Sequence, residues 1–405
     1  MKCQLILALV SSVIASKCAK PAVRREVRDL SEFDLKQFIG AVNALHNEKD
    51  ASGMSSYDNF TKTYIDNIRN LHQTPYFLPW HRAFLRNFER ELHRVNPNVT
   101  LPYWDWSVDS QAPHTSPVLS PMFFGSTGNQ ASDYCITDGP FSNWTMAYPT
   151  PHCLRRSFDE DAEVSPMPLP ESIFLSLNEP KYSDFSQDME IKQSYVHTTI
   201  GGYHGDLTKT FSPNDPLFYL HHTFIDMLWA KWQHMHPDAT QFEGLSYHKE
   251  ASPSDKLAPF TATVAQTLDT RSKSLCYVYP EYPSLIFTRN VPDSVIDAIE
   301  KQSTKNPIIH GSYGNETLGS LASKAPTLPI NTTDMSENFD YPSRHHSHAR
   351  AVEPLPISYI RDNDMDLERV RSFEANEKTL VNYVNENPDF VSHASLQARI
   401  NRYYV

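Results

Sequence analysis

The chain has 405 residues and a formal net charge of −12, and 40% of its residues are hydrophobic and 12% aromatic. This is enough apolar material for one large core with an appendage, or for two smaller cores. The acidic balance argues against nucleic acid and against anionic membrane surfaces, so we expect neither as a partner.

The N-terminus is typical of a secretory signal. Met1 and Lys2 precede a short apolar run over 5–15, and small residues follow it. We assign residues 1–18 to a signal peptide, with cleavage between Ala15 and Ala19 and a buried N-terminal strand as the alternative. Five Asn-x-Thr sequons also indicate a secreted glycoprotein: Asn59, Asn98, Asn143, Asn315 and Asn331.

The cysteines fit the same compartment. Cys3 leaves with the signal, and cleavage before Cys18 leaves an even set of Cys18, Cys135, Cys153 and Cys276. Four cysteines allow three pairings. We favour Cys135 with Cys153 because they bracket one loop-like stretch, and a free Cys276 is the alternative.

Helical patterns dominate the first part of the chain. Ser31 followed by Asp34 predicts a capped helix with one apolar face. Further helices are predicted over 57–72 and from about residue 81. Many Pro, Gly, Ser and Asp residues between 100 and 188 indicate long loops.

Helical patterns return over 190–201 and 218–234. The chain then becomes polar and rich in Pro, Ser and Asn. We divide it into a domain over 26–290, a flexible linker over 291–353 and a C-terminal tail over 354–405.

The linker carries a histidine-rich patch at His345, His346 and His348, which we interpret as a solvated cluster rather than a metal site. The pattern over 364–386 predicts a helix that docks on the main body.

Two histidine-bearing motifs carry the chemistry. The first begins at His72 and reads H-x4-FLPWHR-x2-L-x3-E, with His81 inside it. The second begins at Asp215 and reads DPLFYLHH-x3-D, with His222 as its second histidine, and His197 precedes it in HTTIGG. Both resemble the copper A and copper B signatures of the tyrosinase family, and the resemblance covers about residues 30–290.

This resemblance implies a mainly α fold with a four-helix-bundle dinuclear copper core and long loops. It implies two copper ions, one bound by His72 and His81 and the other by His197 and His222, with His221 packing beside them. Neutral imidazole suits copper, and helices hold such ligands in fixed directions. The family oxidises a small phenol or catechol with O2, and the fungal character suggests pigment or secondary-metabolite biosynthesis.

Other residues of the motifs are expected to be structural. Asp226 could take part in orienting His222, while Arg82, Glu89 and Asp215 are expected as buried ion-pair or capping residues. A structural role is also predicted for the five histidines outside the motifs: His46, His93, His114, His152 and His204.

The chain departs from the family pattern at both coppers. Tyr64 stands eight residues before His72, and Gln193 stands four residues before His197, where the family has histidines. Each copper therefore keeps two imidazoles, because a Gln carbonyl is a weak copper ligand and a phenolate is a poor partner for Cu(I).

Three further positions bear on this departure. Ser194 replaces an asparagine linked to phenol deprotonation, and Asn70 replaces the cysteine that forms a thioether in some members. Glu190 lies near an acid that orders water in some members, and we predict a surface helix residue there. His46 or His204 could substitute as ligands, although neither position is compelling.

Three functions follow from the resemblance. The leading prediction is a copper oxidase for phenols or catechols. The alternatives are a catalytically impaired binding or accessory protein, and an oxygen carrier like a hemocyanin unit. A C-terminal segment that covers the copper pocket until cleavage is also implied, with Arg344 and Arg350 as candidate cleavage points.

Overall fold

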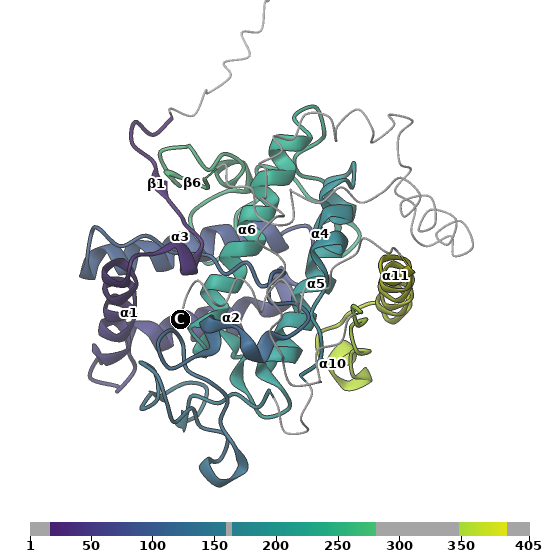
Figure 1. The fold of residues 1–405 in the computed structure, drawn as a ribbon. Helices are drawn as coiled ribbons and strands as arrows, with labels where there is room; N and C mark the ends of the chain where they lie inside the picture. The colour runs from purple at the N-terminus through teal and green to yellow at the C-terminus, as the bar shows by residue number, and fades with distance from the viewer. Residues whose placement is uncertain (1–16, 159–163, 281–347, 387–405) are drawn as a thin grey trace, which may run out of the picture.

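The computed structural model describes residues 17–158, 164–280 and 348–386. Its described part is mainly helical, as expected (Figure 1). The helices are α1 (Glu32–Asn47), α2 (Ser56–Leu71), α3 (Phe77–Val95), α4 (Pro170–Leu177), α5 (Tyr182–Gly201), α6 (Leu217–Met235), α10 (Ile357–Asp362) and α11 (Leu367–Glu386). Short 3-10 helices span Val27–Asp29, Pro113–Thr115, Pro117–Leu119, Gln130–Ser132, Asp206–Thr208, Ser212–Asn214 and Val264–Thr267.

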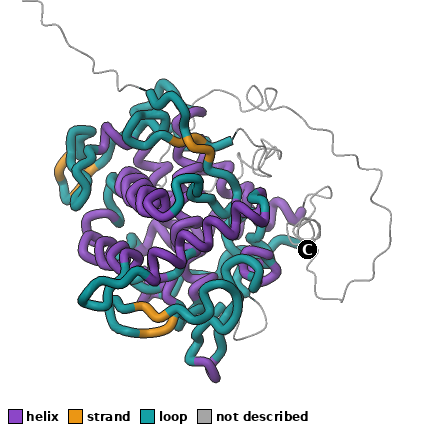
Figure 2. Tube along the Cα trace, turned by 90° about the vertical axis from the view of Figure 1, so that its left-hand side faces the viewer, coloured by secondary structure: helices purple, strands orange, loops and turns teal. Residues whose placement is uncertain are grey.

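The strands are short pairs between loops. β1 (Ala22–Val23) pairs in parallel with β6 (Tyr277–Val278), β2 (Thr145–Met146) pairs antiparallel with β3 (His152–Cys153), and β4 (Leu245–Ser246) pairs antiparallel with β5 (Lys249–Glu250). Figure 2 shows the loops gathered around the central helices. None of the helices in the described ranges is long and apolar enough to span a bilayer.

Several predicted elements are confirmed. The Ser31 hydroxyl accepts from the Asp34 amide at 3.1 Å and caps α1. The predicted helix over 57–72 is α2, which starts with a capping box between Ser55 and Asp58. Asn59, Asn98 and Asn143 are exposed, as glycosylation would require, whereas Asn315, Asn331 and residues 1–16 lie outside the described residues.

Two helix starts were predicted too late. Helix α3 begins at Phe77, because Pro79 falls in the first turn, where the missing N–H has no intrahelical acceptor to lose. Helix α5 begins at Tyr182 and is buried on most sides, so its residues show little amphipathic contrast. Helix α4 lies inside the stretch predicted as loops, with Pro170 at its first position.

Buried ion pairs fix α3 against α6. Arg82 on α3 donates through Nε to Asp226 Oδ1 on α6 at 2.5 Å. Arg24 donates through Nη2 to Glu89 Oε2 at 2.9 Å and through Nη1 to Asp226 Oδ2 at 3.2 Å. The buried structural roles of Arg82 and Glu89 are confirmed. The idea that Asp226 orients His222 is wrong, because its carboxylate is occupied by Arg24, Arg82, Tyr277 and Tyr279.

Two disulfides cross-link loop segments of the described chain. The predicted Cys135–Cys153 pair is confirmed, with Cα atoms 5.6 Å apart. Cys18 pairs with Cys276, with Cα atoms 5.4 Å apart, so Cys276 is not a free thiol. The second disulfide ties the start of the described chain to the neighbourhood of β6.

The predicted docking of the C-terminal helix is confirmed. Figure 1 shows α10 and α11 beside α5. Ile360 and Phe373 of this segment share a buried cluster with Ile191 and Tyr195 of α5. The packing begins before α10, since Val352 is also buried in this cluster, although it lies within the predicted linker. His345 and His346 lie outside the described residues, and His348 is exposed.

We expect Glu89→Gln to lower the free energy of unfolding by roughly 3 kcal/mol or more, because Arg24 is fully buried and loses its closest carboxylate. Burial alone raises the pKa of Glu89, but Arg24 and Arg86 outweigh it and lower this pKa to about 2, from 4.5. The carboxylate therefore stabilises the fold above pH 4.5, and this contribution is lost as the pH falls toward 2.

Urea unfolding of both proteins at several pH values measures this effect. The matched control is Glu91→Gln on the same helix, whose side chain is 39% exposed and should change stability by no more than about 0.5 kcal/mol. Equal losses for the two variants would contradict the role given to Glu89.

Candidate metal centre

The four predicted histidines converge on one place. His72 caps the C-terminus of α2, and His81, His197 and His222 lie on α3, α5 and α6. The rings of His81 and His222 stack with centroids 4.2 Å apart, and that of His72 lies 5.6 Å from that of His81. The Nε2 atoms of His197 and His222 are 3.3 Å apart.

Backbone carbonyls orient two of the rings. His81 Nδ1 donates to Phe77 O at 2.7 Å, and His197 Nδ1 donates to Leu207 O at 2.6 Å. In a neutral imidazole this leaves Nε2 as the atom with a free lone pair. His81 Nε2 is buried and has no hydrogen-bond partner among the described residues.

Burial keeps these rings neutral. It lowers the pKa of His197 to about 4 and lowers the pKa values of His81 and His222 well below 6.5, with smaller contributions from neighbouring histidines. Neutral imidazole is the form that binds a metal.

His72 is held on both sides. Its Nδ1 donates to Glu190 Oε1 at 2.8 Å, and the Tyr64 hydroxyl lies 2.6 Å from its Nε2. Because Nδ1 is the donor, Tyr64 donates to Nε2 in the neutral ring. The prediction of a surface position for Glu190 is wrong: its side chain is buried and also accepts from the Gln73 amide at 2.8 Å.

Gln193 and Ser194 lie buried on α5. Gln193 Oε1 has no hydrogen-bond partner in the described part of the chain, and its Nε2 donates to Ser194 Oγ at 3.3 Å. Tyr359 of α10 reaches this place from the C-terminal segment. Burial raises the pKa of Tyr359 to about 12, opposed by a hydrogen bond with Ser194 and supported by the charge of Glu190.

The substitute ligands considered from the sequence lie elsewhere. His46 stacks on Trp144 with centroids 4.1 Å apart, and His204 stacks on Tyr134 at 3.9 Å. His93 contacts Val99 O at 2.7 Å. Asp215 accepts from the Leu217 amide at the start of α6 and from Arg156, as predicted for a capping residue.

His221 points toward the same centre as its neighbours. Its ring centroid lies 4.9 Å from that of His197 and 4.9 Å from that of His222. The sequence predicted a packing role for it. Leu207 and Tyr359 were not identified as neighbours of the site. Glu190 was noted near an acid of some family members but predicted on the surface, although its helical spacing with Gln193 and His197 would have placed it on the same face.

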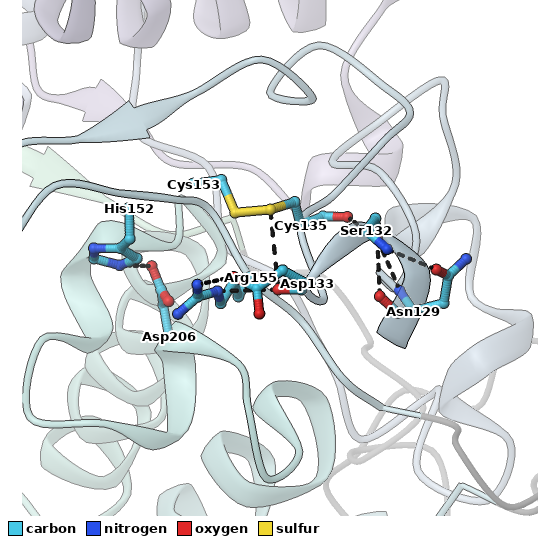
Figure 3. The surroundings of a disulfide bond; sticks show 8 residues. All are labelled: Asn129, Ser132, Asp133, Cys135, His152, Cys153, Arg155 and Asp206. Atoms are coloured by element: carbon cyan, nitrogen blue, oxygen red, sulfur yellow. Dashed lines mark hydrogen bonds and ion pairs between the residues drawn. A yellow bond between two sulfur atoms is a disulfide. The ribbon is translucent and has the colours of Figure 1, made fainter.

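A disulfide loop supports the segment that orients His197. Figure 3 shows His152, next to Cys153, paired with Asp206, whose Oδ2 lies 3.0 Å from His152 Nε2. The Asp206 amide also donates to Arg155 O at 3.0 Å. Asp206 directly precedes Leu207, whose carbonyl accepts from His197, so the disulfide loop is connected to the position of that ring.

Glycine permits the close approach of this loop to α5. Gly202 ends α5 with φ of 62°, and a Cβ there would lie 2.1 Å from Ser157 O. A side chain at this position would therefore push the loop away from the helix.

The donor atoms suit a copper ion on the α5 and α6 side. His197 Nε2 and His222 Nε2 lie 3.3 Å apart, close enough for one metal ion to bind both nitrogens in place of the hydrogen bond between them. On the α2 and α3 side His81 Nε2 is free for a ligand bond, whereas His72 Nε2 accepts from Tyr64.

We expect His152→Gln to destabilise the protein more at pH 5.5 than at pH 8.5. Burial lowers the pKa of His152, but the hydrogen bond and charge of Asp206 outweigh it and raise this pKa above 6.5. The pair therefore stabilises the fold fully below pH 6.5, and the contribution is lost as the pH rises through the raised value. Thermal unfolding at both pH values measures this, and a pH-independent difference would contradict it.

Comparison with known proteins agrees with this geometry. Residues 54–235 match the common central domain of tyrosinase. The tyrosinase-like protein phomQ1 of Diaporthe leptostromiformis is 32% identical over 313 residues, covering 65% of this chain and 78% of the relative. A tyrosinase of Streptomyces lincolnensis is 35% identical over 242 residues, covering 53% of this chain and 83% of the relative.

A solved structure shows the same fold. It is a mutant polyphenol oxidase from Thermothelomyces thermophila, with a TM-score of 0.52 and 23% identity, covering 64% of this chain and 89% of the other. With the motif residues converging and a relative of this identity and coverage, the chain belongs to the tyrosinase family.

Proposed function

We propose that this chain is a secreted, copper-dependent oxidase that acts on a small phenol or catechol with O2. Tyrosinases are type 3 copper proteins with two metal ions. The main support for this proposal is a cluster of buried, neutral imidazoles. In this cluster His81 Nε2 has no hydrogen-bond partner among the described residues, and it lies beside the hydrogen-bonded Nε2 atoms of His197 and His222. In this proposal His72 and His81 hold one copper, and His197 and His222 hold the other.

Copper, when bound, supplies the electron exchange with O2 that amino-acid side chains lack. The protein's contribution is to keep the imidazoles neutral and oriented, through Phe77 O and Leu207 O. Phe218 also packs on His222 with ring centroids 4.2 Å apart. Its buried ring excludes water from one side of the cluster.

Secretion is supported by the described disulfides and by exposed sequons. Pairing of Cys18 with Cys276 requires Cys18 to remain in the mature protein. The predicted signal peptide over 1–18 is therefore too long, and we place signal cleavage before Cys18. A step in pigment or secondary-metabolite biosynthesis is part of the same proposal and rests on likeness to fungal family members.

The docked C-terminal segment is proposed to limit access to the site. Tyr359 lies beside Ser194 and Glu190, next to the proposed ligands. Ile360 is 3% exposed and anchors α10 on Ile191 and Tyr195 of α5.

A specific observation favours a second candidate function, a tyrosinase-like binding or accessory protein without oxidase turnover. The 2.6 Å contact between Tyr64 and His72 Nε2 occupies a nitrogen that the copper oxidase needs. The copper content of the purified protein distinguishes the two candidates.

We expect copper-loaded protein to consume O2 with a panel of phenols and catechols. His81→Ala and His222→Ala should each lower kcat/KM by more than about 100-fold, since loss of a ligand exceeds the effect of its outer-shell partners. His93→Ala, which changes a histidine outside the cluster, is the control. Fewer than one copper per chain after reconstitution, with no O2 uptake, would support the accessory function instead.

The role of the C-terminal segment is tested in the full-length chain. Ile360→Asp places a charge in the buried contact with α5 and should raise kcat/KM for a bulky catechol several-fold, because the segment undocks. Ile357→Asp is the matched control, since Ile357 lies on the same helix but is 57% exposed. Equal kcat/KM values for both variants and the wild type would rule out a covering role.

A further inference from the structure

Three buried histidines form a compact cluster of donor atoms. One ring nitrogen from each of His197, His221 and His222 lies within 4.8 Å of the others. Among the described residues, these are the three His, Cys, Asp or Glu side chains whose possible ligand atoms lie this close together. The cluster includes His221, which the sequence predicted only to pack beside the ligands.

His221 has no other polar role in the described part of the protein. Its side chain is fully buried, and neither Nδ1 nor Nε2 has a hydrogen-bond partner there. A neutral imidazole carries one N–H and one lone pair, so both are buried without compensation. Burying these groups without a partner is unfavourable, and a ligand bond to a metal would offset this cost for the lone pair. The oriented rings of His81 and His197 differ, because each donates Nδ1 to a carbonyl.

The position on α5 where the family has a further histidine lacks an imidazole in this chain. Gln193 stands one helical turn before His197, and its Oε1 is also buried without a partner among the described residues. An amide oxygen is a poor donor for copper compared with imidazole. A site built from α5 and α6 therefore has two imidazoles from His197 and His222 and needs a third.

The ring positions allow His221 to supply it. Successive side chains on a helix diverge by about 100°, which usually sends neighbours to different surroundings. Here the ring planes of His221 stand at 80° to His197 and 72° to His222, with both centroid separations at 4.9 Å. The three rings therefore lie edge to face rather than stacked, with one nitrogen of each within 4.8 Å of the others.

We propose that His221 supplies the third imidazole of a copper site formed with His197 and His222, in place of the histidine that Gln193 has replaced. This inference rests on the proposed copper-binding function. It identifies consecutive residues of α6 as two ligands of one metal.

The test is copper binding by full-length His221→Leu. We expect the affinity of the α5 and α6 site, measured by competition with a chelator, to fall by more than about 100-fold. Electron paramagnetic resonance of the protein loaded with one Cu(II) ion per chain should show one fewer coupled nitrogen. The metal-free variant should unfold at the same temperature as the wild type or higher, because two unsatisfied polar atoms are removed.

Two further variants separate ligation from a structural role. His234→Leu changes an exposed histidine on the same helix and should leave the copper affinity and the spectrum unchanged. Adding Gln193→His to His221→Leu returns an imidazole from α5 and should restore the nitrogen count and bring the affinity to within about tenfold of the wild type. A purely structural role for His221 would not give this rescue. If His221→Leu does not fold, His221→Gln is measured in the same way.

The outcomes distinguish this inference from the proposed function. Copper binding by the wild type and by His221→Leu with equal affinity and equal spectra would overturn the inference and leave the proposed function standing. Absence of copper from the wild type would overturn both.

Discussion

The ion pair between Arg82 and Asp226 fixes the two helices on which the site depends. Arg82 directly follows His81 on α3, and Asp226 lies one turn after His222 on α6. Their 2.5 Å contact therefore also sets the distance at which the two imidazoles stack. Both charges are buried, so either one left alone would carry a large desolvation penalty. Arg24, from the start of the domain, binds the same carboxylate, which links the chain's distant segments to the geometry of the centre.

In each of these imidazole rings, the hydrogen bond that Nδ1 donates leaves Nε2 as the nitrogen that can bind a metal. His81 uses a carbonyl of its own helix, His197 uses Leu207 O from a loop, and His72 uses the carboxylate of Glu190 on another helix. A helix carbonyl is always present four residues earlier, so His81 needs no further support. Leu207 needs its loop held in place, and the Asp206 contacts with the disulfide loop provide this. Formation of the Cys135–Cys153 disulfide would thus support the proposed metal site as well as the fold.

The helical character could be predicted because helical periodicity is a local property. The convergence of the four histidines of the two motifs was implied instead by their resemblance to the tyrosinase family. Helix α5 shows the limit: it is buried nearly all round, so periodicity could not locate its start or distinguish the inner position of Glu190 from a surface one. The partner of Asp226 could not be predicted either. A carboxylate one turn from a ligand is positioned equally well to bind it or an arginine, and only tertiary packing brings Arg24 and Arg82 to it.

Tyr64 and Gln193, which stand where the family has histidines, affect the two halves of the proposed metal centre differently. Tyr64 is a hydrogen-bond donor, and it occupies His72 Nε2, so a metal there competes with a 2.6 Å contact already present. Gln193 removes a nitrogen ligand, and its amide is hydrogen-bonded to Ser194 rather than to His197 or His222, whose Nε2 atoms lie 3.3 Å apart. His221 lies next to them with both nitrogens unused among the described residues. A metal must displace a hydrogen bond on either side. Because the 3.3 Å bond between His197 and His222 is longer and weaker than the 2.6 Å bond between Tyr64 and His72, the α5 and α6 half should bind metal more tightly than the α2 and α3 half.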